Sequence, residues 1–370
     1  MNEAGHELGN EACIALPHEF ALLRTLPNMD VPHVRLGDYP TAVEPLPALG
    51  DVWLKREDAS SPLYGGNKLR TLETLVADAL ARKAKRVWTL GAFGSNQALA
   101  LILHARELPL ATGTVLFPQR ATAAAAENLR AIISHGDRVV PLRSIATFPA
   151  HWWARSRAHA AEYLITPGGA VPLGALGHVG AALELAEQVH AGKMPPPAHI
   201  VLAVGSTCTT AGLLTGLALA RKVEAWPWSL PLVHAVRVTP WPITSRGMIL
   251  RLARATAREI PARGGPTVEI DPSRLRLHTR YFGWGYARIT RAGLLAAAKF
   301  RELSAPPLDT TYAAKSGAAL LDFIDLPGPK LFWCTKSSAP LPPDNAEKLA
   351  AAPAFIRRWL KRAQSNTGPT

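Results

Sequence analysis

The chain lacks the features that several large classes of protein require. Its three cysteines, Cys13, Cys208 and Cys334, lie too far apart in sequence for a disulfide framework or a zinc site with paired ligands. No uncharged apolar run reaches the roughly 18 residues that span a membrane. The first 20 residues carry acidic side chains and no basic segment before an apolar run, unlike a secretory signal. The sequence therefore predicts a cytoplasmic protein that holds no metal ion.

Positively charged residues are in excess over negatively charged ones. The 41 Lys and Arg residues against 28 Asp and Glu residues give a formal net charge of +13, which attracts polyanions and anionic small molecules. The basic runs at 81–86 and 251–258 have no interleaved aromatic residues, and no nucleic-acid-binding signature accompanies them. Both runs are typical of solvated helix faces, so nucleic-acid binding through the basic surface is a remote alternative.

The HExxH, GxSxG and CxxC motifs are also absent, but an alternation of strand and helix patterns is present. It runs between an N-terminal extension at 1–20 and a C-terminal tail at 361–370. Strands are predicted at 51–58, 86–92, 112–118, 199–206 and 330–335, and helices at 71–84, 95–109, 121–134 and 211–223. This alternation predicts an α/β fold with mostly parallel sheets and helices on both faces.

Ligands in such folds bind at strand ends, where helix N-termini offer free amides, and three loops have a suitable composition. In the first, "YGGNKLR" at 64–70, Gly65 and Gly66 permit backbone conformations that other residues avoid, and Lys68 stands where a helix begins. A helix N-terminus disfavours a cation and so lowers the pKa of the amine, which suits a nucleophile that forms Schiff bases. The alternative is an ordinary surface lysine after a turn.

The other two loops favour anions. In "GAFGSNQ" at 91–97, the amides and Ser95 could hold a carboxylate and Asn96 a phenolic oxygen, or the loop is an ordinary helix cap. In "GSTCTTAG" at 205–212, amides and hydroxyls could form a phosphate site, or small residues simply allow close helix packing. The first of these lacks the GxGxxG pattern and the second lacks the Walker ending.

A lysine, a carboxylate loop and a phosphate site are the parts that a pyridoxal phosphate enzyme needs. The segments "LKREDASSPLYGGNKLRTLE", "GAFGSNQ", "PGGAVPLGALGHVGAALELAEQV" and "GSTCTTAGL", in this order, resemble the family of 1-aminocyclopropane-1-carboxylate deaminases and D-cysteine desulfhydrases. The resemblance extends over about residues 30 to 340. It implies a two-lobed, tryptophan-synthase-β-like fold, with a larger cofactor-binding lobe at 21–70 and 190–360 and a smaller mobile lobe at 71–189. It also implies a homodimer.

The resemblance implies roles for individual residues. For pyridoxal 5'-phosphate it implies a covalent link to Lys68 and contacts with Asn67, Asn96, Gly205, Ser206, Thr207, Thr209 and Thr335. For the substrate carboxylate it implies contacts with Ser95, Asn96 and Gln97, and for catalysis it implies Lys68, Ser95, Tyr286 and Tyr312. Gly65 and Gly66 would then leave room for the cofactor ring.

The implied activity is that of a lyase or deaminase on a small amino acid. It would be β-elimination to pyruvate and ammonia, as in D-cysteine desulfhydrase, or a reaction like that of the cyclopropane deaminase. Three sites depart from the family: Ala313 stands where relatives have glutamate or threonine, and Thr207–Cys208 and Lys336–Ser337 replace glycine pairs. A relative that binds the cofactor but has lost or altered its activity is therefore the alternative.

Overall fold

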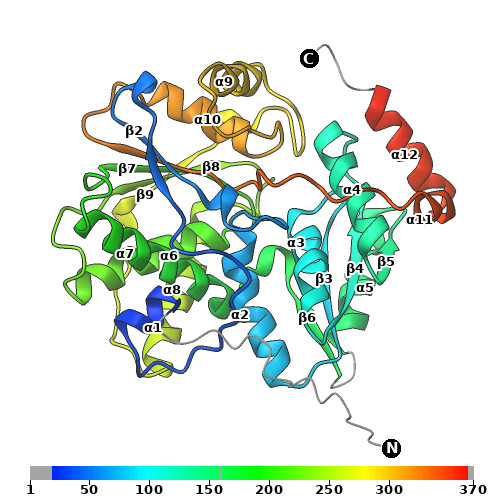
Figure 1. Cartoon of the computed structure of the whole chain (residues 1–370), viewed down its shortest axis with the longest axis horizontal. Helices are drawn as coiled ribbons and strands as arrows, with labels where there is room; N and C mark the ends of the chain where they lie inside the picture. The colour runs from blue at the N-terminus through cyan, green and yellow to red at the C-terminus, as the bar shows by residue number, and fades with distance from the viewer. Residues whose placement is uncertain (1–18, 158–160, 366–370) are drawn as a thin grey trace, which may run out of the picture.

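Two separate sheets organise the computed structural model, which describes residues 19–157 and 161–365 (Figure 1). Most of the predicted extension at 1–20 and part of the predicted tail at 361–370 lie outside these residues. Every strand pair is parallel except β1 with β2, and helices cover the sheets. The predicted α/β fold with mostly parallel sheets is confirmed.

The larger sheet has six strands, in the order β1, β2, β10, β7, β8, β9. Their bounds are β1 (Val43–Pro45), β2 (Val52–Lys55), β10 (Lys330–Trp333), β7 (His199–Val204), β8 (Leu232–Arg237) and β9 (Leu275–His278). The central strand β10 is buried along its whole length, with Leu331 opposite Trp53 on one side and Ile200 on the other. Its apolar run is typical of a parallel strand covered on both faces.

The smaller sheet has four strands, in the order β5, β4, β3, β6. Their bounds are β5 (Arg138–Pro141), β4 (Ala111–Phe117), β3 (Arg86–Ala92) and β6 (Glu162–Ile165). The strand predicted at 86–92 is therefore confirmed residue for residue. The strands predicted at 199–206 and 330–335 each end two residues earlier, at Val204 and Trp333.

Helices connect these strands. The α-helices are α1 (Ala21–Thr25), α2 (Lys68–Ala81), α3 (Asn96–His104), α4 (Ala123–His135), α5 (Phe148–Ser156), α6 (Pro172–His190), α7 (Cys208–Lys222), α8 (Arg246–Ala262), α9 (Arg291–Glu302), α10 (Ala313–Asp322), α11 (Ala346–Ala351) and α12 (Ala354–Ser365). Short 3-10 helices are η2 (Pro47–Leu49), η3 (Glu57–Ala59), η4 (Ala105–Glu107), η5 (Ile145–Thr147), η6 (Pro167–Gly169), η7 (Pro272–Arg274) and η8 (Arg280–Phe282). No helix in these ranges is both long and apolar enough to cross a membrane.

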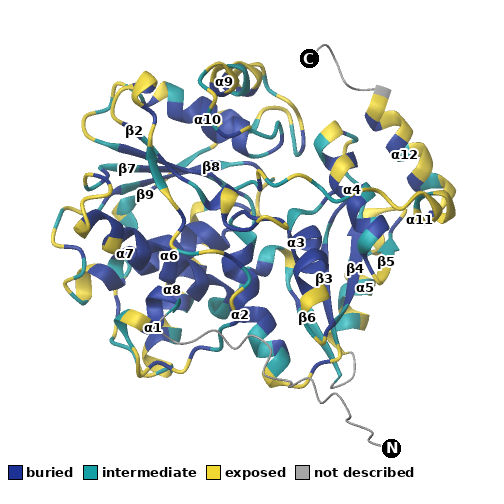
Figure 2. Cartoon of the chain, in the orientation of Figure 1, coloured by how far each residue is buried: buried dark blue, intermediate teal, exposed yellow. Residues whose placement is uncertain are grey.

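Helix α6 is buried on nearly all sides and packs against α2 and α7 (Figure 2). Its residue Gly177 lies against the start of α2, where a β-carbon would come within 1.8 Å of the Arg70 carbonyl oxygen. Only a residue without a side chain permits this approach. The close contact fixes the beginning of α2, the helix whose first residue is Lys68.

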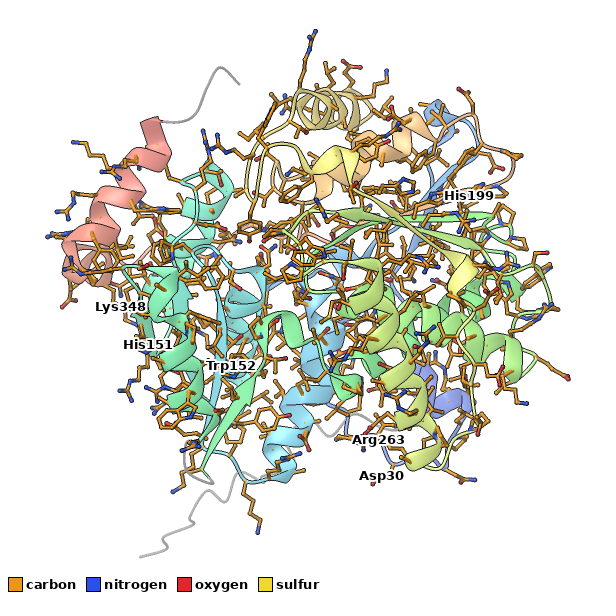
Figure 3. All side chains as sticks on the ribbon, turned by 180° about the vertical axis from the view of Figure 1, so that it is seen from behind. Asp30, His151, Trp152, His199, Arg263 and Lys348 are labelled. Atoms are coloured by element: carbon orange, nitrogen blue, oxygen red, sulfur yellow. The ribbon has the colours of Figure 1, made fainter. Side chains whose placement is uncertain are left out.

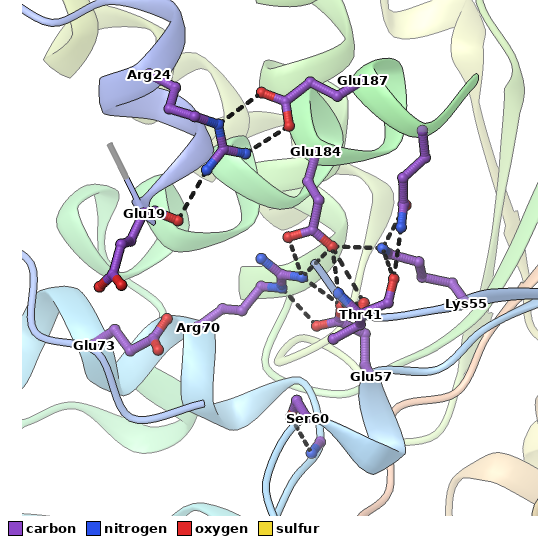
Figure 4. A network of polar contacts seen from close by, with 12 residues as sticks. Glu19, Arg24, Thr41, Lys55, Glu57, Ser60, Arg70, Glu73, Glu184 and Glu187 are labelled. Carbon is purple, nitrogen blue, oxygen red and sulfur yellow. Dashed lines mark hydrogen bonds and ion pairs between the residues drawn. The ribbon is translucent and has the colours of Figure 1, made fainter. Parts of the chain in front are cut away.

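A buried network of charges ties α2 to the larger sheet (Figure 4). Arg70 donates to Glu57 at 2.7 Å and to Glu184 of α6 at 2.9 Å, and Lys55 of β2 donates to Glu184 at 2.5 Å. All four side chains are at most 3% exposed. Because Glu57 turns into this network, the strand predicted at 51–58 ends at Lys55 and η3 follows.

The chain returns to the smaller sheet after β10. Helices α11 and α12 lie beside α4, where Trp359 packs edge-on against Phe93 with ring centroids 5.4 Å apart (Figure 1). The apolar side chains of α12 share one core with α2, α3 and α4, while α6 shares the core of the larger sheet with α7 and α8. The predicted lobe boundaries at 70, 189 and 360 stay a prediction.

Candidate active site

A cavity of about 830 Å³ lies where the carboxyl ends of strands from both sheets meet. Its wall combines the three loops singled out in the sequence with two tyrosines that lie outside those loops, Tyr286 and Tyr312. The predicted site residues on this wall are Asn67, Lys68, Ser95, Asn96, Gln97, Gly205, Ser206, Thr207, Thr209, Tyr286, Tyr312 and Thr335. The structure therefore brings together every residue that the sequence predicted for the site, although their roles stay predictions.

Lys68 is the first residue of α2, and its amine lies 3.4 Å from the Ser206 hydroxyl. Burial lowers the pKa of Lys68 below its usual value, and the neighbouring Cys208 partly opposes this shift. The amine is therefore more often neutral at physiological pH than an exposed lysine is. A neutral amine can act as a nucleophile or a base.

The two glycines before Lys68 make close backbone contacts. A β-carbon on Gly65 would lie 2.5 Å from the Asp58 carbonyl oxygen, and one on Gly66 would lie 2.8 Å from the Thr335 carbonyl oxygen. Gly66 also has a φ of +99° and pairs with Lys336 in an isolated bridge. These contacts account for the two glycines, and the room that they would leave for a cofactor ring stays a prediction.

The predicted phosphate loop leads from β7 into α7. The N-terminus of α7 offers free amides, and the Thr210 hydroxyl is buried without a partner among the described residues although it lies on the cavity wall. Asn67 donates to the Thr209 hydroxyl at 2.7 Å, and the Ser206 hydroxyl donates to the Gly168 carbonyl at 3.2 Å. An anion with several oxygens fits this donor set, so the residues suit the phosphate of the predicted cofactor.

Thr207 is one of the departures that the sequence suggested in this loop. Its φ of 75° is in the left-handed region, which β-branched residues rarely adopt. The next residue, Cys208, is buried, and its thiol donates to the Gly169 carbonyl at 3.2 Å. The loop thus holds a threonine in a backbone conformation that favours glycine.

The predicted carboxylate loop leads into α3. Ser95 caps the helix by accepting from the amide of Ala98 at 3.3 Å, and the first-turn amides of Asn96 and Gln97 have no partner within the helix. The Gln97 side chain donates instead to the Thr89 hydroxyl at 2.8 Å. For an incoming carboxylate, Gln97 therefore offers its backbone amide rather than its side-chain nitrogen.

Asn96 is held by two neighbours. Its Oδ1 accepts from the Tyr64 hydroxyl at 2.9 Å and from Asn128 Nδ2 at 2.6 Å. Since Oδ1 already accepts two hydrogen bonds, Nδ2 is the group of Asn96 that can donate to a cofactor oxygen. Lys336, one of the departures from the family, donates to the Tyr64 hydroxyl at 2.9 Å, and burial lowers the pKa of this lysine.

Tyr286 and Tyr312 meet at the cavity, with 2.5 Å between their hydroxyl oxygens. Burial raises the pKa of both phenols, so both are protonated at neutral pH. Tyr312 precedes α10, whose first amides are capped by the Asp309 carboxylate, and the Ala313 amide donates to that carboxylate at 3.0 Å. Thr335 lies on the wall, and its carbonyl accepts from the amide of Asn67 at 3.2 Å.

His178, which lies behind the phosphate loop, was not predicted from the sequence. Its Nε2 is 3.0 Å from the Thr71 hydroxyl and 3.2 Å from the Thr209 hydroxyl. Burial, Arg70 and Lys68 hold the pKa of His178 well below its usual value, so the ring is neutral. The signal was a histidine in the otherwise small and apolar segment 172–182, which is quoted above for its resemblance alone.

Known proteins are similar to this chain over most of its length. A family model described as "Pyridoxal-phosphate dependent enzyme" matches residues 34–322. The chain is 34% identical to a nocardicin C-9' epimerase of Nocardia uniformis subsp. tsuyamanensis over 85% of this chain and 97% of that protein. It is 30% identical to a D-cysteine desulfhydrase of Salmonella paratyphi C, over 79% of this chain and 88% of the relative.

Among solved structures, the chain resembles a crystal structure titled as an ACC deaminase homologue. The TM-score is 0.70 and the identity 28%, over 87% of this chain and 95% of that one. A fungal L-serine ammonia-lyase from Rhizomucor miehei shares the fold, with a TM-score of 0.53 and 17% identity over 90% of this chain and all of that one.

Proposed function

The chain belongs to the family of pyridoxal-phosphate dependent enzymes, and we propose that it is a lyase or deaminase in which Lys68 removes the α-proton of an amino acid. Pyridoxal 5'-phosphate is its cofactor, as predicted. The observation that carries the proposal is the position of Lys68, which shares one cavity with the phosphate loop, the carboxylate loop and the tyrosine pair. Cytoplasmic location and assembly as a homodimer stay predictions.

The cofactor supplies, when bound, an electron sink that makes the α-proton of an amino acid acidic. The amides at the start of α7, with Ser206, Thr209 and Thr210, would hold its phosphate. Asn96 Nδ2 would donate to its phenolic oxygen, and Thr335 lies on the same wall.

Different residues of this chain then orient the substrate, remove its α-proton and protonate its leaving group. The first-turn amides of α3 and the Ser95 hydroxyl orient the carboxylate, which directs the α-proton towards one base. Lys68, with its lowered pKa, takes that proton. The phenol pair of Tyr286 and Tyr312 is protonated and can donate to a leaving group at the β-carbon. Loss of that group as its conjugate acid and addition of water give a 2-oxo acid and ammonia.

Epimerisation at the α-carbon is a second candidate. The tyrosine pair provides an acid besides Lys68 in the same cavity, and such an acid could return a proton to the face opposite the one that lost it. The 34% identity to an epimerase also favours it. Inversion needs no β-leaving group, so it would also act on amino acids that cannot undergo elimination.

Deuterium exchange tests the proposal. In ²H₂O, D- and L-amino acids with β-leaving groups should form a 2-oxo acid and ammonia, while inversion with deuterium at the α-carbon and no ammonia would indicate an epimerase. Lys68→Ala should lower either rate by about 10²- to 10⁴-fold, and the surface variant Lys85→Ala should not. If the loaded enzyme exchanges no α-proton in any amino acid, the proposal fails in favour of a cofactor-binding relative with lost activity.

A further inference from the structure

Part of the cavity wall is apolar and lies outside the predicted cofactor and carboxylate sites. From the smaller-sheet side it includes Phe117 and Pro118 at the end of β4, and Ile145 in η5. From the opposite side it includes Ile243 and Met248. A cysteine or serine side chain has one carbon and one heteroatom, so it does not need an apolar wall of this extent.

These apolar side chains are exposed at the cavity rather than packed in a core. Ile145 is 58% exposed, Ile243 is 56% exposed and Met248 is 40% exposed. Large apolar groups left in contact with water on a cavity wall are typical of a surface that a ligand covers. An occupant with its own apolar surface would release that water.

One face of α8 forms this side of the cavity. Met248, Arg251, Leu252 and Ala255 all line it and recur at helical spacing, so they lie along one stripe of the helix. Ser245 caps α8 by accepting from the amide of Met248 at 3.2 Å, which fixes where the stripe begins. The stripe therefore belongs to a capped helix and not to a loop.

Arg251 is the cation of this stripe. No described residue accepts a hydrogen bond from its guanidinium or forms an ion pair with it, although Glu259 pairs with Arg263 on the same helix. A guanidinium on a cavity wall binds a carboxylate in a bidentate manner better than a lysine does. This chemistry favours a ligand whose distal end is anionic.

We propose that the substrate is an amino acid with a bulky apolar or aromatic side chain that ends in a carboxylate. The apolar part lies against Ile145, Ile243 and Met248, and the carboxylate meets Arg251. This inference rests on the proposed function, because it assumes that the α-carbon of the substrate is near Lys68.

Three probes of increasing size test it: cysteine, S-benzylcysteine and S-(4-carboxybenzyl)cysteine, each in both configurations. Affinity is measured by calorimetry on holoenzyme whose link between Lys68 and the cofactor has been reduced with borohydride, so that no turnover occurs. The rate of α-proton exchange in ²H₂O is measured on the untreated holoenzyme. We expect the carboxybenzyl compound to bind at least about 10-fold more tightly than cysteine and to have the highest kcat/KM for exchange.

Variants on α8 separate the two contacts. Arg251→Ala should weaken binding of the carboxybenzyl compound about 10-fold and leave the benzyl compound unchanged, whereas Met248→Ala should weaken both. Arg254→Ala is the matched control, because Arg254 is exposed on the same helix but does not line the cavity, and it should change neither.

The outcomes distinguish the two proposals. If cysteine exchanges its α-proton and binds as tightly as the larger probes, the substrate inference is wrong and the proposed function stands. If the larger probes bind tightly but no compound exchanges its α-proton, the proposed function is wrong and the apolar wall is a binding site for another reaction. If Arg251→Ala and Arg254→Ala weaken binding of the carboxybenzyl compound equally, Arg251 is not the residue that binds its carboxylate.

Discussion

At the scale of single residues, Gly66 shows how a position beside the active site depends on backbone shape. Its φ of +99° is unfavourable for any residue with a β-carbon, and the nearest backbone atoms to such a carbon would be the Thr335 carbonyl oxygen at 2.8 Å and the Ser337 amide at 3.1 Å. The penalty for a side chain therefore has two parts, one conformational and one steric.

Gly66→Ala tests this, with Gly50→Ala as the matched control. Gly50 also has a positive φ, of +72°, but a β-carbon there would meet no atom within 4 Å. We expect the control to lose about 1–2 kcal/mol in the free energy of unfolding and Gly66→Ala to lose more, by about 1–3 kcal/mol, because backbone atoms must also shift. Urea denaturation measures both. Equal losses would mean that the steric part is absent.

Much of the site at this scale could be predicted from the sequence, because each loop joins a strand pattern to a helix pattern and carries its polar residues in one short run. The partners that hold those residues could not. Lys336 contacts Tyr64 across 272 residues of chain, and Lys55 contacts Glu184 across 129. Local periodicity holds no information about such pairs, so Lys336 was recognised as a departure but not as a neighbour of Tyr64.

At the scale of elements, the charge network joins three pieces of secondary structure through one carboxylate. Glu184 of α6 accepts from Lys55 of β2 and from Arg70 of α2 (Figure 4). Burial alone would raise the pKa of Glu184, but Arg70 and Lys55 lower it below its usual value. Because the folded pKa is below the unfolded one, this stability is present above the unfolded pKa and is lost as the pH falls through the folded pKa.

Glu184→Gln should therefore lower the free energy of unfolding at pH 7 by about 3–5 kcal/mol, since buried Lys55 loses its charged partner and buried Arg70 keeps only Glu57 of its two. The control is Glu187→Gln on the same helix, because Glu187 pairs with Arg24 where both side chains are 33–44% exposed, and it should lose less than about 1 kcal/mol. Chemical denaturation measures both. A loss of under about 1 kcal/mol for Glu184→Gln would show that α2 does not depend on this carboxylate.

Three histidines cross the larger sheet from β7 to β9. His199 Nδ1 is 3.0 Å from His234 Nε2, and His234 Nδ1 is 3.0 Å from His278 Nε2. Since His199 Nε2 faces the Pro327 carbonyl at 3.2 Å, His199 donates there, His234 donates to His199 and His278 donates to His234. Each ring nitrogen between these residues already donates or accepts one hydrogen bond, so a further proton on His234 would disrupt this series of hydrogen bonds. Burial, His278 and His199 lower the pKa of His234 to about 3.

The histidine chain predicts acid sensitivity. The folded pKa of His234 is below the unfolded one, so its contribution to stability is complete above about pH 6.5 and is lost as the pH falls towards 3. His234→Phe should make the fall in unfolding free energy between pH 7 and 4 less steep. The change in slope should correspond to at most about one proton in the difference between the protons bound by the unfolded and the folded state. His151 lies on the opposite side of the molecule from His199 in Figure 3. His151→Phe therefore leaves the three hydrogen-bonded histidines unchanged and should retain the wild-type slope. Identical slopes for both variants would contradict the assignment.

The bounds of the elements were predicted with unequal accuracy. Strand β3 was predicted residue for residue, and α2 begins at Lys68, as the loop at 64–70 predicted, although the apolar periodicity of the helix starts only at 71. The difference arises because the chain enters the helix directly from Gly66, whose bridge to Lys336 is a contact between distant segments. Strands β8 and β9 have mixed polar sequences, "LVHAVR" and "LRLH", and their strand structure depends on neighbours and not on pattern.

At the scale of the whole molecule, the active site depends on two sheets, and the C-terminal part of the chain connects them. After strand β10 of the larger sheet, the chain passes to the smaller sheet, where Arg130 of α4 forms an ion pair with Asp344. Helix α12 then packs Ile356 and Leu360 into the core that α2, α3 and α4 share. Since α2 carries Lys68 and α3 carries the carboxylate loop, α12 supports both walls of the cavity.

Ile356→Ala tests whether α12 is an integral part of that core. Its side chain is fully buried, so the cavity created should lower the free energy of unfolding by about 2–5 kcal/mol, while the exposed neighbour Arg358→Ala should change it by less than about 0.5 kcal/mol. Hydrogen exchange locates the effect: amides of α3 and α4 should lose protection together with those of α12, because the three helices share one core. If only the amides of α12 lose protection, the helix is an appendage, and the smaller sheet holds the carboxylate loop in place without it.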